Sequence, residues 1–135
     1  MNAHDVMLTK GIAYRKTVRQ LELALKDHRI TVAEWLCLGA VGSGIYGGGE
    51  LAGILGVTKG MASRQLGELQ SRQLVQEIID KKDARARTYG LTKLGKQLLE
   101  ASDVSATTSM KQWLSSVEPA EIHIYIRVLA LVAKL

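Results

Sequence analysis

Residues 50–69 constrain the fold more than any other part of the chain. They predict two short helices separated by Gly56, which can adopt the left-handed conformation of a tight turn at little cost. Thr58 is placed to cap the second helix, because its hydroxyl can accept a hydrogen bond from a free backbone amide. The apolar residues recur at helical spacings: Leu51, Ala52 and Leu55, then Ala62, Leu66 and Leu69. Ala52 is small where the helices must cross, so the segment predicts a helix-turn-helix.

The outward face of the second helix carries side chains that can read DNA. Arg64 can bond guanine through two nitrogens, Gln65 can do the same with adenine, and the helix N-terminus favours phosphate. The alternative is an ordinary solvated face. Gly60 and Gly67 each cost about 1 kcal/mol relative to alanine inside a helix, and this cost disfavours a purely structural role for the helix. The residues expected to contact DNA from this helix are Thr58, Lys59, Gly60, Met61, Ser63, Arg64 and Gln65.

A β-hairpin is expected directly after the helix-turn-helix. Apolar and β-branched residues at 74–79 and 88–91 flank a charged tip, and the combination of helix-turn-helix and hairpin predicts a winged helix. An arginine on such a wing can enter the narrow minor groove of DNA, where the negative potential is enhanced. The cationic residues expected at the tip are Lys81, Lys82, Arg85 and Arg87.

Positive charge concentrates in the same part of the chain. The protein carries a formal net charge of +5, and residues 58–100 hold nine basic and five acidic side chains. Clustered positive charge is typical of proteins that bind polyanions. A solvated basic surface would look the same by charge alone, so the residue pattern has to decide between the two.

The flanking segments predict further helices. One is expected over 6–27, with Tyr14, Val18, Leu21 and Leu25 in an apolar stripe. Thr31 and Glu34 form a capping box at the start of the next helix. Five glycines within residues 42–49 then predict a connecting loop.

The C-terminal part predicts two more helices. Thr92 is placed to cap the first, and Pro119 stands in the first turn of the second. That last helix is apolar almost all round, which requires cover on more than one side. A second subunit is the expected cover.

Other classes of protein are disfavoured. The single cysteine, Cys37, excludes a disulfide scaffold, and we expect it to be a small buried hydrophobe rather than a redox centre. His4, His28 and His123 are scattered, so we expect no enzyme, no catalytic residues, no metal site and no cofactor. No apolar run reaches the ~18 residues of a membrane span, and the N-terminus lacks the pattern of a secretory signal. A cytoplasmic protein without membrane contact is therefore expected.

Taken together, these residues resemble the MarR family of multiple-antibiotic-resistance regulators. The resemblance rests on 30–35 and on Glu50-Leu51-Ala52 with Val57-Thr58-Lys59-Gly60. Its most specific part is Asp80-Lys81-Lys82-Asp83-Ala84-Arg85 followed by Leu91-Thr92-Lys93-Leu94-Gly95, which is similar to the family's wing and the helix start after it.

The resemblance implies a mainly α fold with a small β-hairpin wing, in which a winged helix-turn-helix domain joins a helical dimerisation domain. It assigns 1–29 and 92–135 to dimerisation and 30–91 to DNA binding. Residues 59–65 would enter a major groove and Arg85 the minor groove, with Asp83 orienting Arg85 through a salt bridge.

The function implied is that of a sequence-specific transcriptional regulator. We expect a repressor that binds a pseudo-palindromic operator in double-stranded DNA as a homodimer, and that a small aromatic or phenolic effector releases. Two departures from the family pattern stand out: Lys82 replaces an arginine, and Gln73 stands where a glycine commonly ends the recognition helix. The alternative is a winged helix that binds another protein and has no specific operator. Lys59, Arg64 and Arg85 disfavour it, because protein interfaces prefer apolar and aromatic anchors.

Overall fold

The computed structural model describes residues 1–79 and 87–135. Its elements follow in the order α1 (Ala3–Leu25), the 3-10 helix η1 (Lys26–His28), α2 (Val32–Gly42), β1 (Tyr46–Gly47), α3 (Gly48–Leu55), α4 (Lys59–Ser71), β2 (Val75–Ile79), β3 (Arg87–Leu91), α5 (Lys93–Trp113) and α6 (Pro119–Val132). The fold is mainly helical with one small antiparallel sheet, which confirms the predicted fold class.

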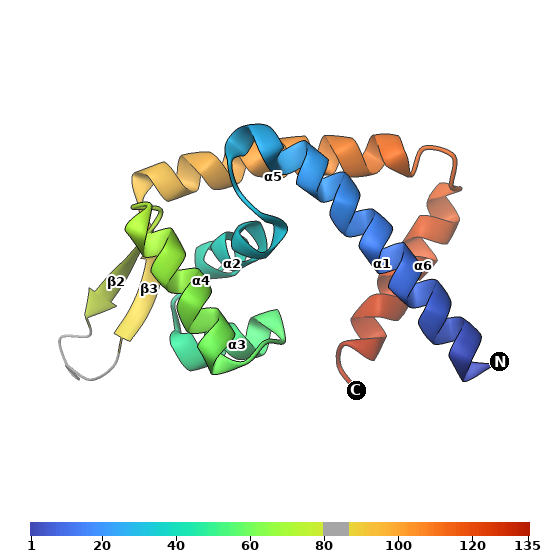
Figure 1. Cartoon of the computed structure of the whole chain (residues 1–135), viewed down its shortest axis with the longest axis horizontal. Helices are drawn as coiled ribbons and strands as arrows, with labels where there is room; N and C mark the ends of the chain where they lie inside the picture. Colours follow the sequence, from blue (N-terminus) through green and yellow to red (C-terminus); the bar gives the residue numbers. More distant parts are fainter. Residues whose placement is uncertain (80–86) are drawn as a thin grey trace.

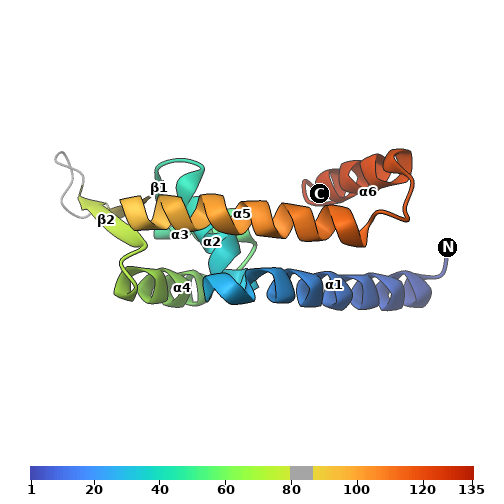
Figure 2. The ribbon, with the colours of Figure 1, turned by 90° about the horizontal axis from the view of Figure 1, so that it is seen from above.

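The elements form a winged-helix lobe and a region of long helices (Figure 1). The winged-helix lobe contains α2, α3, α4 and the sheet, and α5 runs from this lobe to the region where α1 and α6 lie (Figures 1 and 2). One buried core joins the two parts, because Leu25 of α1 and Ala106 of α5 belong to the same cluster as Leu38 and Leu69. The predicted division into domains at 1–29, 30–91 and 92–135 stays a prediction.

Polar caps set the helix starts as the sequence predicts. The hydroxyl of Thr31 accepts from the amide of Glu34 at 3.1 Å, and the Glu34 carboxylate accepts from the amide of Thr31 at 3.1 Å, which completes the capping box. Thr58 caps α4 by accepting from the Met61 amide at 3.2 Å. Gly56 ends α3 with a φ of 66°, the left-handed conformation expected of this turn.

The glycine-rich segment differs from the predicted loop. Tyr46 and Gly47 form β1, which pairs with Tyr89 and Thr88 of β3, so that β3 is the central strand in the order β1-β3-β2. The next two glycines open α3, which begins earlier than the expected residue 50. Helix-breaking residues are tolerated there because first-turn amides have no partner within a helix, and the carboxylate of Glu50 accepts from the Gly47 amide at 3.3 Å.

A close backbone contact fixes α5 against the segment that joins α4 to β2. A Cβ atom at Gly95 would overlap the carbonyl oxygen of Leu74. The same junction is held by the Thr92 hydroxyl, which donates to the Gln73 carbonyl at 2.6 Å. Gln73 itself has a φ of 59°, so a non-glycine residue occupies the left-handed conformation that glycine would adopt more cheaply.

Candidate nucleic-acid interface

Helix α4 separates a buried face from an exposed one. Ala62, Leu66 and Leu69 are buried against the lobe, as their spacing predicts. The residues that the structure leaves exposed among those expected to contact DNA are Thr58, Lys59, Gly60, Met61, Ser63 and Arg64. Polar and cationic groups therefore reach solvent next to the positive end of the helix dipole.

The glycines of α4 are not required by packing inside the chain. A Cβ atom at Gly67 would meet nothing within 4 Å, and one at Gly60 would meet only the hydroxyl of Thr58 at 4.0 Å. An alanine would fit at both positions and would favour the helix. These glycines keep the outer surface of α4 flat where another molecule could approach the backbone closely.

Gln65 is placed differently from the other predicted contacts. It is half-buried, and its Oε1 atom is buried without a hydrogen-bond donor among the described residues. Together with Met61 it lines a pocket that α1 closes on the other side. We call this space the α1–α4 pocket.

The charged residues near α4 fall into two groups. Among the described residues, neither Lys59 nor Arg64 has a salt-bridge partner, so both cations are available to a ligand. Arg72 instead lies 3.1 Å from Glu34, which ties the end of α4 to the capping box of α2. Sequence reasoning did not single out Arg72. The sequence feature that could have indicated a partner for Arg72 is Glu34, because the capping box uses only one of its two carboxylate oxygens.

The wing is described only in part. Arg87 begins β3, and its guanidinium lies 3.7 Å from the carboxylate of Glu77 on β2. Both side chains are solvated, so this pair contributes little to stability. The remaining predicted wing residues, Lys81, Lys82, Asp83 and Arg85, lie outside the described residues.

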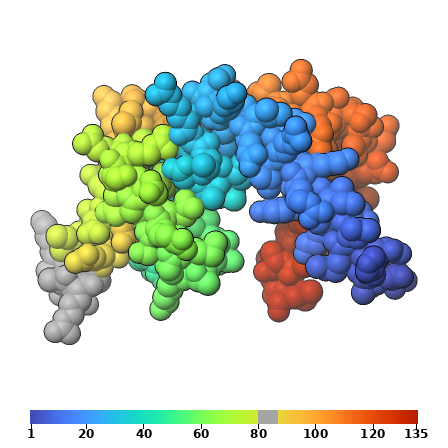
Figure 3. Space-filling model, viewed as in Figure 1, coloured from blue at the N-terminus to red at the C-terminus, as the bar shows by residue number. Residues whose placement is uncertain are grey.

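The terminal helices leave apolar surface uncovered. No residue of α6 is buried. Seven of its large apolar side chains are between 44% and 60% exposed: Ile124, Tyr125, Ile126, Val128, Leu129, Leu131 and Val132. Val6, Met7 and Leu8 of α1 are also exposed. Figure 3 shows a hollow between α6 (red) and the winged-helix lobe (green).

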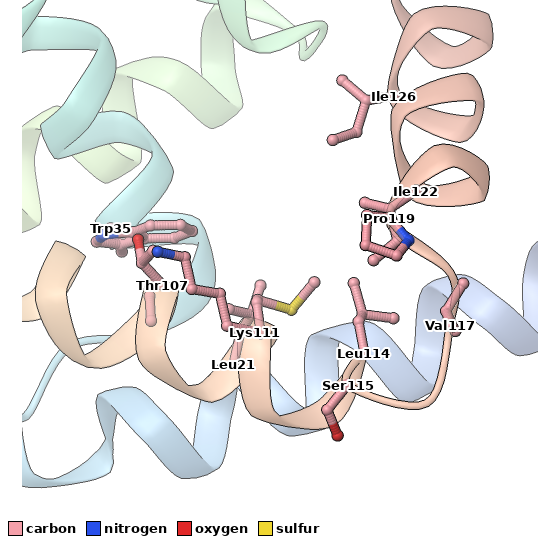
Figure 4. A pocket seen from close by; sticks show the side chains of 12 residues that line it. Leu21, Trp35, Thr107, Lys111, Leu114, Ser115, Val117, Pro119, Ile122 and Ile126 are labelled. Carbon is pink, nitrogen blue, oxygen red and sulfur yellow. The ribbon is translucent and has the colours of Figure 1, made fainter.

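A larger apolar pocket lies where α5 turns into α6. It has a volume of about 590 Å³, and we call it the α5–α6 pocket. Trp35 of α2 and Lys111 of α5 are among its lining residues, and Figure 4 shows the Lys111 side chain extending toward Trp35. No motif in the sequence marks this pocket, because most of its wall consists of ordinary apolar residues.

Three further features of the structure concern the cysteine, metal binding and membrane crossing. Cys37 is fully buried in the core, and burial raises the pKa of its thiol to about 11, so the thiol stays protonated near neutral pH. Within residues 1–79 and 87–135, no cluster of three or more His, Cys, Asp or Glu side chains could hold a metal ion. None of the helices described is both long and apolar enough to cross a membrane.

Comparison with known proteins gives matches at the level of structure. No protein-family model matches the sequence, and no curated protein matches it in a sequence search. A MarR-family transcriptional regulator from Rhodococcus sp. RHA1 superposes with a TM-score of 0.88 at 14% identity, covering 98% of this chain and 95% of that one.

Two further structures are of proteins that respond to a ligand or have one bound. BpsR from Bordetella bronchiseptica, whose DNA binding 6-hydroxynicotinic acid regulates, has a TM-score of 0.85 at 20% identity, over 96% of this chain and 98% of that one. CouR from Rhodococcus jostii RHA1, bound to p-coumaroyl-CoA, has a TM-score of 0.84 at 16% identity, over 96% and 92% of the two chains. This chain has the fold of the MarR-family transcriptional regulators.

Proposed function

We propose that this protein is a sequence-specific DNA-binding transcriptional regulator that acts as a homodimer. The observation that carries the proposal is the outer face of α4, where Lys59 and Arg64 are unpaired among the described residues and two glycines face open space. A major groove accepts a helix with cations at its N-terminal end, and flat glycine surface lets the helix approach the DNA backbone. The fold shared with MarR-family regulators supports the same function.

The uncovered terminal helices support a homodimer. An exposed apolar surface as continuous as that of α6 usually marks an interface. Pairing two copies through α1 and α6 would cover these side chains and place two copies of α4 on one duplex. A two-fold dimer of this kind reads a pseudo-palindrome, and a protein bound there would act as a repressor by blocking transcription.

The α5–α6 pocket supports control by a small aromatic acid. Trp35 offers an aromatic surface, and Lys111 is the charged residue among the described residues that line the pocket. A cation in an apolar pocket favours an anionic ligand. Two proteins with this fold respond to or bind aromatic ligands, namely 6-hydroxynicotinic acid and p-coumaroyl-CoA. A ligand of this class would release the operator if it binds the DNA-free conformation more tightly.

Selection of bound sequences from random double-stranded DNA tests the proposal. We expect a pseudo-palindromic motif, and we expect Arg64→Ala to weaken binding to it by about tenfold or more if Arg64 contacts guanine. Arg19→Ala, which removes an exposed arginine from α1, is the matched control and should leave affinity unchanged. Recovery of no motif, with equal binding by both variants, would favour the protein-interaction alternative instead.

Control by an effector is tested by measuring binding to the selected DNA with and without a phenolic acid, 4-hydroxyphenylacetate. We expect the acid to weaken DNA binding by the wild-type protein and to have a smaller effect on Lys111→Met. An equal effect on both proteins would exclude Lys111 as the group that holds the acid.

A further inference from the structure

The α1–α4 pocket is a second cavity that the proposed function does not use. Its volume is about 410 Å³. Tyr14, Val18 and Glu22 line it from α1, and Met61 and Gln65 line it from the recognition helix. The three α1 residues recur at intervals of four and therefore share one helix face. The N-terminal part of α2 and the end of α3 complete the wall.

A side chain that lines this pocket carries a hydrogen-bond acceptor without a partner in the described part of the chain. The Oε1 atom of Gln65 is buried and receives no hydrogen bond from the described residues. Buried acceptors are nearly always paired, because losing hydration without a replacement bond costs free energy. A ligand in the pocket would recover that cost if the amide turned its oxygen toward a donor on the ligand.

The charge of the pocket wall selects the type of donor. Among the described residues that line it, Glu22 is the charged one, and no described lysine or arginine pairs with it. Tyr14 adds an aromatic ring whose face attracts cations. The α5–α6 pocket is lined instead by the cation Lys111. The two pockets therefore favour ligands of opposite charge.

We propose that the α1–α4 pocket binds a small apolar organic cation, a protonated primary amine on an aromatic or aliphatic body. On binding, the Gln65 amide turns so that its Oε1 faces the pocket and accepts a hydrogen bond from the ammonium group, which Glu22 also attracts. The apolar body packs against Val18 and Met61. This binding does not depend on DNA, so it is measured on the full-length protein alone.

Three compounds with the same phenylbutyl body test the charge preference: 4-phenylbutylamine, 4-phenylbutanol and 5-phenylpentanoate. We expect calorimetry to give the tightest binding for the amine and the weakest for the carboxylate. Glu22→Gln should weaken amine binding by about fivefold, the effect of a solvated ion pair, and leave alcohol binding unchanged. Equal binding of the amine and the alcohol to the wild-type protein, or an amine affinity unchanged in Glu22→Gln, would overturn the proposal.

Gln65→Met removes the acceptor while keeping the length of the side chain. We expect it to raise Tm by a few degrees, because the unpaired acceptor is gone, and to weaken amine binding by about fivefold. Lys111→Met should leave amine binding unchanged. If Lys111→Met weakens amine binding while Gln65→Met does not, the amine occupies the α5–α6 pocket and the proposal is wrong.

Met61 and Gln65 belong to the recognition helix, so an occupied pocket should change DNA affinity. This step rests on the proposed function. We expect saturating 4-phenylbutylamine to shift the affinity for the selected DNA in the wild-type protein but not in Gln65→Met. An unchanged affinity with the amine bound would exclude the coupling. A protein that binds the amine but no DNA would contradict the proposed function and leave the pocket assignment standing.

Discussion

In the winged-helix lobe, Leu38, Leu51 and Leu69 are completely buried, whereas α6 of the same chain has no buried residue at all. The core of the lobe is completed within the same chain, because Leu25 of α1 and Ala106 of α5 join its buried cluster. Helix α5 also contacts the backbone of Leu74, and α4 is tied to α2 through Arg72 and Glu34. Helix α6 and the N-terminal part of α1 carry large apolar side chains and leave them exposed. The difference teaches that the chain itself buries the apolar residues of the winged-helix lobe and leaves those of α6 exposed.

The largest effect on this comparison is expected from Gly95→Ala. An added methyl group would collide with the Leu74 carbonyl, and the backbone cannot yield without moving α5 from the wing. We expect a loss of about 3 kcal/mol in the free energy of unfolding, measured by urea denaturation. Gly53→Ala is the control, because its Cβ meets nothing within 4 Å in α3 and should be neutral or slightly stabilising. Equal stability of the two variants would show that the contact does not hold the lobe together.

The next largest effect is expected on self-association through α6, whose apolar side chains are exposed. Ile124→Lys with Leu131→Lys places two charges on one face of α6, seven residues apart. If α6 is buried between two copies, we expect the dimer dissociation constant to rise by about 100-fold in sedimentation experiments. Ile79→Lys, at an exposed position of β2, should not change association. A wild-type protein that sediments as a soluble monomer at micromolar concentration would refute the dimer.

The buried thiol gives a pH dependence that belongs to the winged-helix lobe. The pKa of Cys37 is about 11 in the folded chain against 9.0 for a free thiol. The unfolded chain therefore loses this proton first as pH rises, and the folded state becomes less stable between these two values. We expect a loss of about 2 kcal/mol across this range in denaturation experiments. Cys37→Ala should lack this component of the pH dependence, and an identical slope in both proteins would show that the thiol is not responsible.

The smallest expected effect changes stability and binding in opposite directions. Gly67→Ala should stabilise the protein by about 1 kcal/mol, because alanine favours the helix and meets no neighbour. The same methyl group should weaken binding to the selected DNA if α4 approaches the duplex closely. Calorimetric unfolding and a DNA titration give the two values. Gains in both stability and affinity would show that the glycine serves no close contact.

Sequence reasoning predicted the parts of this molecule that local chemistry determines. The caps at Thr31, Thr58 and Thr92, the turn at Gly56 and the buried stripe of α4 all follow from spacing and residue type. The strand at Tyr46 was not predicted, because its pairing with Tyr89 is a contact between distant residues inside a glycine-rich segment.

The site could be predicted only in part, because it too depends on contacts between residues that are distant in the sequence. The exposed cations of α4 follow from helical periodicity. The buried amide of Gln65 and the two pockets depend on how α1, α2 and α5 pack, and no local pattern records that packing. Gln65 in particular has the residue type of a base-reading side chain, yet its amide oxygen faces the protein interior.

Affinity as a function of half-site spacing tests the central claim, that two copies of α4 read one duplex together. The selected half-sites would be separated by increasing numbers of base pairs in synthetic DNA, with the protein titrated against each duplex. We predict tight binding where the centres lie about one helical turn apart, or a multiple of it, and weak binding between those spacings. Equal affinity at every spacing, or full affinity for a single half-site, would contradict the account.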